Sequence, residues 1–159
     1  MRRFVGLLLA AVVSLVALFY FGMRRNWPPV LNAVRRASRA FKPIVLKTAG
    51  TPGAPTSVVR HAGRRSGRHY ETPVVAAPTP DGFAIALPYG ADVDWLKNVV
   101  AAGSATIVAD GSEHTVTDPA VVPIDEVDSY FEDKEQRLHQ RFAVTTAVRV
   151  RSTDGSDVA

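Results

Sequence analysis

The stretch His61-Ala-Gly-Arg-Arg-Ser-Gly-Arg-His-Tyr-Glu-Thr-Pro73 sets three arginines around two glycines, between two runs of β-branched residues. Glycine allows positive φ angles and lets a ligand approach the main chain closely. Successive N–H groups in such a turn can form an anion-binding concavity, and arginine adds a planar fork of donors that suits phosphate and carboxylate. The stretch therefore predicts a β-hairpin whose turn binds an anion or, alternatively, only carries solvated arginines.

The turn matches neither of two common nucleotide-binding motifs. A phosphate-binding loop needs four residues between its glycines and a following Lys, and a dinucleotide fingerprint needs a further glycine and a helix straight after it. Gly63 and Gly67 have neither feature around them. The turn alone therefore points to an anion without naming one.

The segment Leu87–Gly103 predicts a short helix. Asp92 or Asp94 can cap its N-terminus, and the final glycine can close it. Trp95 and Asn98 then lie at neighbouring positions, one turn apart. Because an unpaired buried amide is costly, we expect Asn98 to need a hydrogen-bonding partner if it is buried.

Four short motifs, in their order and spacing, resemble the deazaflavin-dependent nitroreductase family. They are Gly63-Arg64-Arg65-Ser66-Gly67-Arg68, Thr72-Pro73, Asp81-Gly82 and Trp95-x-x-Asn98-x-x-x-Ala102-Gly103. The resemblance covers residues 58–122 and weakly the remainder of the chain. It implies a split β-barrel that uses the reduced deazaflavin coenzyme F-420 as hydride donor. Better-known members often have Ser-Lys-Gly-Gly where this chain has Pro88-Tyr89-Gly90.

The same resemblance implies a coenzyme site. The arginine-rich turn and the strand after it would hold the phosphate and side chain of F-420, and the loop and helix further on would hold the deazaflavin. The residues so implied are Arg64, Arg65, Ser66, Gly67, Thr72, Pro73, Pro88, Tyr89, Gly90, Trp95 and Asn98. Tyr89 and Tyr130 are candidate proton donors, with a role in the core or at a pocket rim as the alternative for each.

The order of expected elements favours a mainly β (α+β) domain over residues 56–151. Strands are expected at residues 57–61, 68–77, 83–87, 105–109, 113–117, 119–123 and 143–151, and a second helix at residues 125–140. A regular alternation of strands and helices, typical of a doubly wound sheet, is absent. This order favours a small closed or nearly closed antiparallel barrel. The resemblance to the nitroreductase family implies that the barrel is a split antiparallel β-barrel, similar to FMN-binding barrels, with two short helices.

Residues 1–25 are expected to form a transmembrane anchor. Phe4–Met23 contains no charged residue and has the length of about 20 residues that crosses the hydrocarbon core as a helix. A cleaved signal peptide and a buried helix are the alternatives. More cations follow this run than precede it, which predicts a single-pass protein of the cell membrane with its barrel in the cytoplasm.

Residues 26–55 are expected to form a basic amphipathic helix and a linker. From Pro28 to Lys42 apolar and basic residues alternate at helical spacing, and the Gly- and Pro-rich linker follows at residues 48–55. Such a helix can lie at the level of lipid headgroups or pack on the barrel with a solvated basic face. We expect no nucleic-acid partner, because no aromatic residues interleave with the arginines and the formal net charge of +4 is mild. Residues 152–159 are expected to be a disordered tail.

The composition removes several other classes of chemistry. The chain has no cysteine, which excludes disulfides, thiolate nucleophiles and Cys-ligated metal centres. The histidines lack the paired spacing of a helical metal site, so no metal is expected, and no Gly-x-Ser-x-Gly elbow is present.

The sequence favours a membrane-anchored oxidoreductase that transfers a hydride from reduced F-420 to an electron-poor, lipophilic or quinone-like acceptor. A non-catalytic protein that binds or stores F-420, a related barrel that binds FMN or haem, and a membrane-tethered interaction module are the alternatives.

Overall fold

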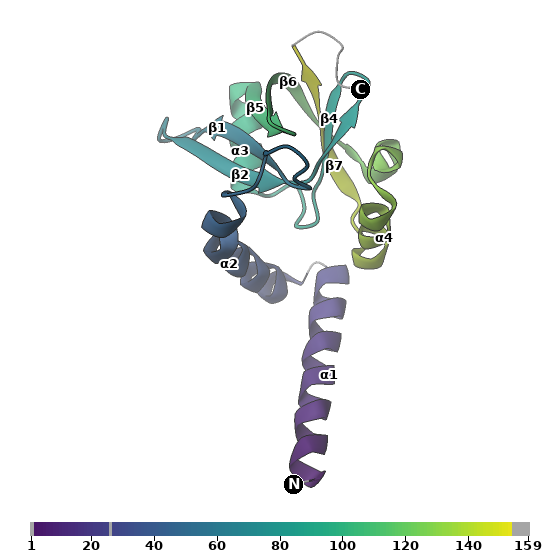
Figure 1. The fold of residues 1–159 in the computed structure, drawn as a ribbon. Helices are drawn as coiled ribbons and strands as arrows, with labels where there is room; N and C mark the ends of the chain where they lie inside the picture. Colours follow the sequence, from purple (N-terminus) through teal and green to yellow (C-terminus); the bar gives the residue numbers. More distant parts are fainter. Residues whose placement is uncertain (1, 26, 154–159) are drawn as a thin grey trace.

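A single antiparallel sheet, curled into a half-open barrel, forms the body of the protein (Figure 1). The computed structural model describes residues 2–25 and 27–153. Its helices are α1 (Arg2–Arg24), α2 (Pro28–Val45), α3 (Asp94–Ala102) and α4 (Asp133–Phe142), with 3₁₀ turns η1 (Ile124–Glu126) and η2 (Asp128–Tyr130). Its strands are β1 (Ser57–Ala62), β2 (His69–Val74), β3 (Ala76–Thr79), β4 (Gly82–Ala86), β5 (Ser104–Ala109), β6 (Ser112–Pro123) and β7 (Thr146–Ser152).

The sheet has the strand order β2-β1-β5-β6-β7-β4-β3, and all neighbouring strands run antiparallel. Its two edge strands, β2 and β3, follow each other in the chain with only Val75 between them. Because β2 pairs with β1 and β3 pairs with β4, the barrel is split between these two edges. The mainly β, split-barrel class expected from the sequence is confirmed.

Two strand expectations need correction. The single strand expected over residues 68–77 is two strands, β2 and β3, because the register with β1 ends at Ser57↔Val74 and the chain then turns to pair with β4. The two strands expected at 113–117 and 119–123 are one strand, β6, with a register shift between Thr117 and Ala120. Residues 112–117 of this strand pair with β5, residues 116–123 pair with β7 on the other side, and the shift lies within the β6–β7 pairing.

The helix expected at residues 125–140 is also different. Two 3₁₀ turns precede α4, and Phe131 between them and the helix has an extended backbone, with φ −81° and ψ 153°. Val127 and Phe131 are buried together in a cluster with Ala84 and Ala147 of the sheet. Burying both side chains against the sheet accounts for the interruption, which helical periodicity alone does not predict.

The C-terminal tail was expected to begin at residue 152. Instead Ser152 ends β7, and Thr153 donates a backbone hydrogen bond of 2.9 Å to the Thr115 carbonyl. The rest of the expected tail, residues 154–159, lies outside the described residues. The segment at residues 48–55, expected to be a linker, lies against the β5–β6 turn: Gly50 O accepts a 2.7 Å hydrogen bond from Gly111 N.

Helix α3 packs on the barrel through Leu96 and Val99, which belong to the main buried cluster with strand residues such as Val59 and Ile107. The helix ends at Gly103, whose φ is +69°, as expected. The expected side-chain cap is absent, because Val93 occupies the N-cap position. Asp92 forms an ion pair with Lys97 instead. Packing, rather than capping, therefore fixes α3 in place.

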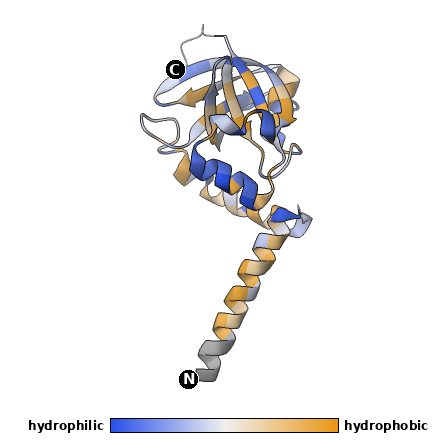
Figure 2. Ribbon diagram, turned by 90° about the vertical axis from the view of Figure 1, so that its right-hand side faces the viewer, coloured by the Kyte–Doolittle hydropathy of each residue, from blue (hydrophilic) through white to orange (hydrophobic). Residues whose placement is uncertain are grey.

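Helix α1 extends away from the barrel (Figure 1), and its exposed surface is largely apolar (Figure 2). Among the described residues, its contacts with the rest of the protein lie at its C-terminal end. Phe19 lies with its ring centroid 6.3 Å from that of Phe142 in α4, and Gly22 is in close contact with Val30 of α2. Arg24 donates to the Arg141 carbonyl at 3.3 Å, which caps the C-terminus of α4 with a cation.

Among the described residues, no single helix combines the length and hydropathy required of a membrane span. Residues Leu8–Arg24 meet that requirement only together with α2, across a bend of 99°.

Gly82 should be much less tolerant of a side chain than Gly53, although both have positive φ angles of +151° and +71°. A methyl group at Gly82 would overlap the Val150 carbonyl and lie 2.7 Å from Ser152 N, whereas at Gly53 it meets no atom within 4 Å. We expect Gly82→Ala to lower the free energy of unfolding by about 3 kcal/mol or more, and Gly53→Ala by about 1 kcal/mol. Urea unfolding of the full chain in mild detergent measures both, and equal losses would contradict the β4–β7 register.

Candidate functional site

The β1–β2 turn, residues 63–68, is compact and open to solvent on one side. Gly63 N donates to Arg68 O and Gly67 N donates to Gly63 O, each at 2.8 Å. Gly67 has a φ of +64°, and a methyl group placed on it would meet no atom within 4 Å. A ligand can therefore approach the main chain of the turn at Gly67.

Asn98 of α3 fixes this turn from beneath. Its side chain is only 6% exposed. Its Oδ1 accepts hydrogen bonds from the Arg64 backbone N–H at 3.2 Å and from Arg64 Nη1 at 2.8 Å. Its Nδ2 donates to His61 Nδ1 at 3.2 Å. The amide predicted to need partners thus finds them inside the protein and joins α3 to the end of β1 and to the start of the turn.

His61 completes this buried network. Since its Nδ1 accepts from Asn98, the proton of the neutral ring lies on Nε2, which donates to Thr72 Oγ1 at 3.3 Å. Its ring stacks on that of Tyr70 at 5.8 Å. Burial, and then the charge of Lys42, lower the pKa of His61 below its ordinary value of 6.5. The neutral imidazole therefore belongs to the folded structure.

The arginines of the turn have different environments. The Arg64 side chain is 27% exposed and bonds α3 through Asn98 and an ion pair with Asp94 at 3.2 Å. Arg65 and Arg68 are exposed, and neither forms an ion pair with any described residue. The cations of the turn that are free for a ligand are therefore Arg65 and Arg68, while Arg64 holds the turn in place.

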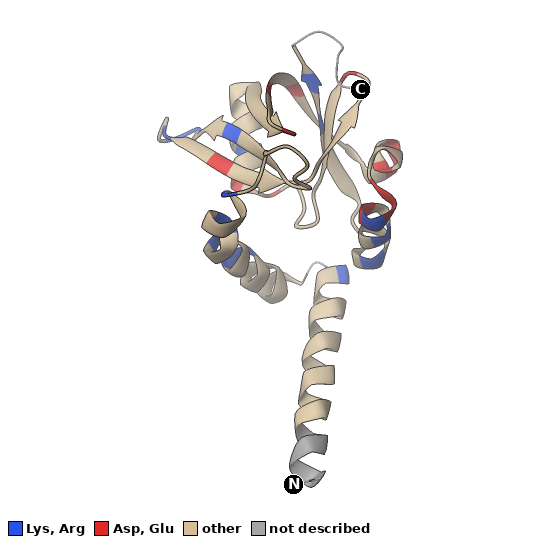
Figure 3. Cartoon of the chain, viewed as in Figure 1, with Lys and Arg blue, Asp and Glu red and all other residues tan. Residues whose placement is uncertain are grey.

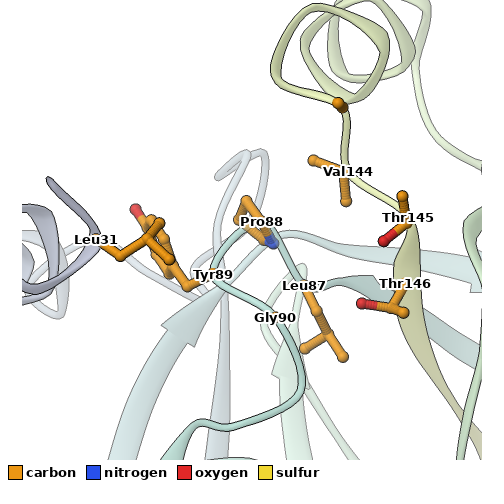
Figure 4. Close-up of a pocket in the computed structure, with 9 residues that line it drawn as sticks. Leu31, Leu87, Pro88, Tyr89, Gly90, Val144, Thr145 and Thr146 are labelled. Carbon is orange, nitrogen blue, oxygen red and sulfur yellow. The ribbon is translucent and has the colours of Figure 1, made fainter. Parts of the chain in front are cut away.

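The loop Leu87–Gly90 lines a separate cavity of about 160 Å³ (Figure 4). Pro88, Tyr89 and Gly90 lie on one side of it, Leu31 of α2 adjoins them, and residues 143–146 form the other side. Gly90 has a φ of +74° and open space beside it, as Gly67 does in the turn.

Arg35 of α2 holds this loop. Its Nη2 donates to the Tyr89 carbonyl at 2.8 Å. Its Nε is buried and has no hydrogen-bonding partner among the described residues.

The implied site residues thus fall into two groups. Arg64 and Asn98 share one network, which reaches Thr72 through His61, and the exposed Arg65, Ser66 and Gly67 lie at the tip of the same turn. Pro88, Tyr89 and Gly90 line the cavity. Pro73 is half-buried on β2, and Trp95 is half-buried against the core.

The two candidate proton donors line different cavities. Tyr89 lies in the cavity beside α2, whereas Tyr130 lines a larger one of about 450 Å³, together with Phe83 and His114. A single reaction centre in either cavity can therefore use only one of these tyrosines.

Three residues with a role in this region were not among the implied site residues: His61, Arg35 and Asp94, which was expected only as a helix cap. A sequence signal existed for His61, because Val59 and His61 share the buried face of β1 while Arg60 is exposed. Across the hairpin His61 pairs with Tyr70, and Ala62 pairs with His69. Arg35 carried no local signal beyond the basic face of its helix.

We expect Arg64→Ala to lower the free energy of unfolding by about 1–3 kcal/mol, because it leaves a buried amide oxygen with one partner fewer. Asn98→Ala should cost a similar amount, and the double variant should cost less than the sum of the two, since both remove the same bond. Arg65→Ala is the matched control and should stay within about 0.5 kcal/mol of the wild type. Urea unfolding measures all four proteins; additive losses would show that the Arg64–Asn98 bond does not contribute.

The lowered pKa of His61 makes stability depend on pH. The unfolded chain takes up a proton at His61 more readily than the folded chain, so stability should fall as pH drops below about 6.5. In His61→Gln this part of the loss should be absent, and the melting temperatures of the two proteins should change differently between neutral and mildly acidic pH. Parallel changes in both would show that His61 is not buried in its neutral form.

A comparison with protein-family models gives no match, and neither does one with curated proteins. The solved structures that match part of this chain at low identity include the following three. One is the protein Atu2129, of unknown function, from Agrobacterium tumefaciens str. C58, with 17% identity and a TM-score of 0.43 over 62% of this chain and 48% of that one. This chain thus spans about half the length of that structure.

The second is an F420-H2 dependent reductase (FDR-A), with 15% identity and a TM-score of 0.38 over 61% of this chain and 94% of that one. The third, a domain-swapped dimer, has 15% identity and a TM-score of 0.37 over 61% of this chain and 80% of that one. Structural neighbours of this chain thus include an F420-H2 dependent reductase at low identity.

Proposed function

We propose that the protein binds the deazaflavin coenzyme F-420 and transfers a hydride from its reduced form to an electron-poor acceptor. The observation that carries the proposal is the rigid, exposed turn at residues 63–68. Asn98 holds it from beneath through Arg64, while Arg65 and Arg68 remain free of ion pairs with the described residues. Two unpaired guanidinium groups on an ordered turn suit the phosphate and acidic tail of F-420.

The residues present fit such a coenzyme in several respects. Gly67 and Gly90 each leave open space beside the main chain, one at the turn and one at the cavity. Ser66 adds a hydroxyl next to the two free arginines, and Thr72 and Pro73 continue along β2 from the turn. The cavity beside Gly90, at about 160 Å³, is below the roughly 300–1,000 Å³ of complete small-molecule sites. In this proposal Pro88, Tyr89 and Gly90 would hold part of the ring system, and Arg65 and Arg68 of the turn would hold the phosphate and tail.

When bound, F-420 supplies the hydride; the protein binds and orients it and excludes water. In this proposal Arg64 and Asn98 act by positioning the turn. Arg35 orders the loop through the Tyr89 carbonyl, which sets the Tyr89 ring at the cavity. The Tyr89 hydroxyl is then the better candidate for proton delivery, since Tyr130 lines the other cavity.

Two further functions use the same residues differently. A protein that only binds or stores F-420 needs the arginine-rich turn but no acceptor site, and it would bind the reduced coenzyme without oxidising it in the presence of an acceptor. A barrel for FMN or haem would take up that cofactor in preference to F-420, which the absorption spectrum of the purified protein mixed with each cofactor distinguishes.

We also propose that α1 anchors the protein in the cell membrane, with the barrel in the cytoplasm. The uncharged run Phe4–Met23 and the exposed apolar side chains of α1 support this, as does its position away from the barrel (Figure 2). The cavity beside Tyr89 lies between α2 and the segment that follows α4. α2 and α4 are also the helices that contact the end of α1. A lipophilic, quinone-like acceptor could thus reach the cavity from the bilayer.

Arg65→Ala should weaken the binding of F-420 by roughly ten-fold to a hundred-fold, because a charge-assisted hydrogen bond contributes about 1.5–3 kcal/mol. The loss should shrink at high salt, where screening already weakens the wild-type attraction. Fluorescence titration of the detergent-solubilised chain with F-420 measures it. Arg149→Ala, a change on β7 outside the proposed site, is the control. If neither Arg65→Ala nor Arg68→Ala changes the affinity for F-420, the arginines of the turn are only solvated and do not bind the coenzyme.

The full chain should sediment with membranes and resist extraction by high salt and alkali, because a spanning helix leaves the bilayer only in detergent. Protease added to intact cells should leave the barrel uncut, and protease added to inverted vesicles should digest it. Recovery of the full chain in the soluble fraction would disprove the anchor, and digestion in intact cells would reverse the topology.

A further inference from the structure

Charge is distributed very unevenly along the chain. No aspartate or glutamate precedes Glu71, so all 15 acidic residues lie after residue 70. Thirteen of the 19 lysines and arginines lie before it. Such an asymmetry between the two parts of a chain suggests a surface that meets an anionic partner.

The structure gathers several of these cations at one end of the molecule. Lysines and arginines occupy α2 and the end of α4 nearer to α1, while the acidic residues of α4 lie toward its other end (Figure 3). Arg25, Arg36, Arg39, Arg137 and Arg141 are exposed and form no ion pair with the described residues. These five residues define the basic face.

Apolar side chains accompany the basic face on α2. Trp27 is 45% exposed, Phe41 61% and Ile44 63%. At helical spacing Phe41 lies on the side opposite to Arg36 and Arg39, Ile44 lies beside Phe41, and Trp27 is the N-cap residue just before the helix. An exposed helix with one apolar side and one cationic side is typical of helices that lie in the headgroup region of a bilayer.

The angle between the first two helices fits this arrangement. α2 is bent by 99° from the α1 axis. If α1 runs along the membrane normal, α2 lies parallel to the membrane surface, at the depth where α1 leaves the bilayer. The contacts of α1 with Val30 and Phe142 bring both α2 and the end of α4 to this depth.

We propose that α2 and the basic face form a docking surface for anionic lipid headgroups. The inference rests on the proposed anchoring through α1 and goes beyond it: α1 attaches the chain, and α2 with the arginines sets the barrel against the surface. The apolar side of α2 enters the headgroup region, and the arginines bind phosphate groups of anionic lipids. The Arg35 bond to the Tyr89 carbonyl then connects a lipid-bound helix to the cavity loop.

An anionic bilayer fits this surface better than a nucleic acid or an acidic protein does. Large exposed apolar side chains on α2 have no role in contacts with phosphate backbones, which dominate non-specific nucleic-acid binding. The basic face also lies near the C-terminal end of α1, an apolar helix. A bilayer suits both features, because its interior accommodates the apolar helix and its anionic headgroups bind the arginines.

The absence of cysteine allows a direct test with single-cysteine variants of the full chain. Ile44→Cys in α2 carries an environment-sensitive fluorophore. Pro80→Cys, in the exposed β3–β4 turn beside the end of β7, is the matched control at the far end of the barrel (Figure 1). Each protein is reconstituted into vesicles of phosphatidylcholine alone, or of equal parts phosphatidylcholine and phosphatidylglycerol, and acrylamide quenching is measured.

We expect the Ile44→Cys label to be protected from acrylamide in anionic vesicles, and much less in neutral ones or at high salt. Each cation near an anionic surface strengthens binding by roughly five-fold. Arg36→Glu combined with Arg39→Glu should therefore shift the equilibrium toward the undocked helix by more than about ten-fold and restore quenching. The Pro80→Cys label should be quenched equally in all vesicles.

Each of the following results would overturn the proposal. One is a label on α2 that acrylamide quenches fully while the chain still resists alkaline extraction from the vesicles. That result would support the anchor and refute the docking surface. Another is equal protection in neutral and anionic vesicles, or protection that the double variant retains. The third is protection of the detergent-solubilised chain by a DNA oligonucleotide, which would identify a nucleic-acid surface. A chain that alkali removes from all vesicles refutes the anchor and the docking surface together.

Discussion

The buried amide of Asn98 determines the position of the arginine-rich turn relative to α3, the helix that packs on the barrel. Asn98 lies on α3 among apolar residues, where its carbonyl and amino groups need partners. Arg64 supplies the donors and His61 the acceptor, both from the β1 side of the turn. Because any other position of the turn would leave these groups unpaired, the network fixes the direction in which the remaining arginines point. The proposed anion site is therefore a consequence of a requirement inside the protein.

The class of fold could be predicted because it depends on local signals. Short strands bounded by Gly, Pro and Asp, such as those near residues 82–86 and 104–109, appear in the structure within a residue or two of where they were expected. The boundaries that were wrong depend on partners far away in sequence. The strand expected over residues 68–77 is interrupted at Val75 because β3 pairs with β4. The helix expected at residues 125–140 is interrupted because Val127 and Phe131 pack against the sheet.

In the site, too, the types of residue could be predicted from the sequence, whereas the environment of each residue depends on parts of the chain that are far away in sequence. Sequence identifies an arginine-rich turn, but Arg64 and Arg65 are identical neighbours, and only the position of α3 gives one of them a structural role. Tyr89 and Tyr130 likewise have equal standing in the sequence, and the fold assigns them to different cavities. The bond from Arg35 joins residues 54 positions apart in the chain, a distance over which no sequence pattern indicates contact.

The central place of β7 has a consequence for biosynthesis. β7 lies between β6 and β4 and is the only strand that joins the two parts of the sheet, β2-β1-β5-β6 and β4-β3, in the described chain. Until β7 has been synthesised, a nascent chain holds two sheet fragments, each with an open edge that can pair with another molecule. A ribosome that pauses before Thr146 therefore presents an aggregation-prone intermediate, and chaperone demand should peak at that stage of translation.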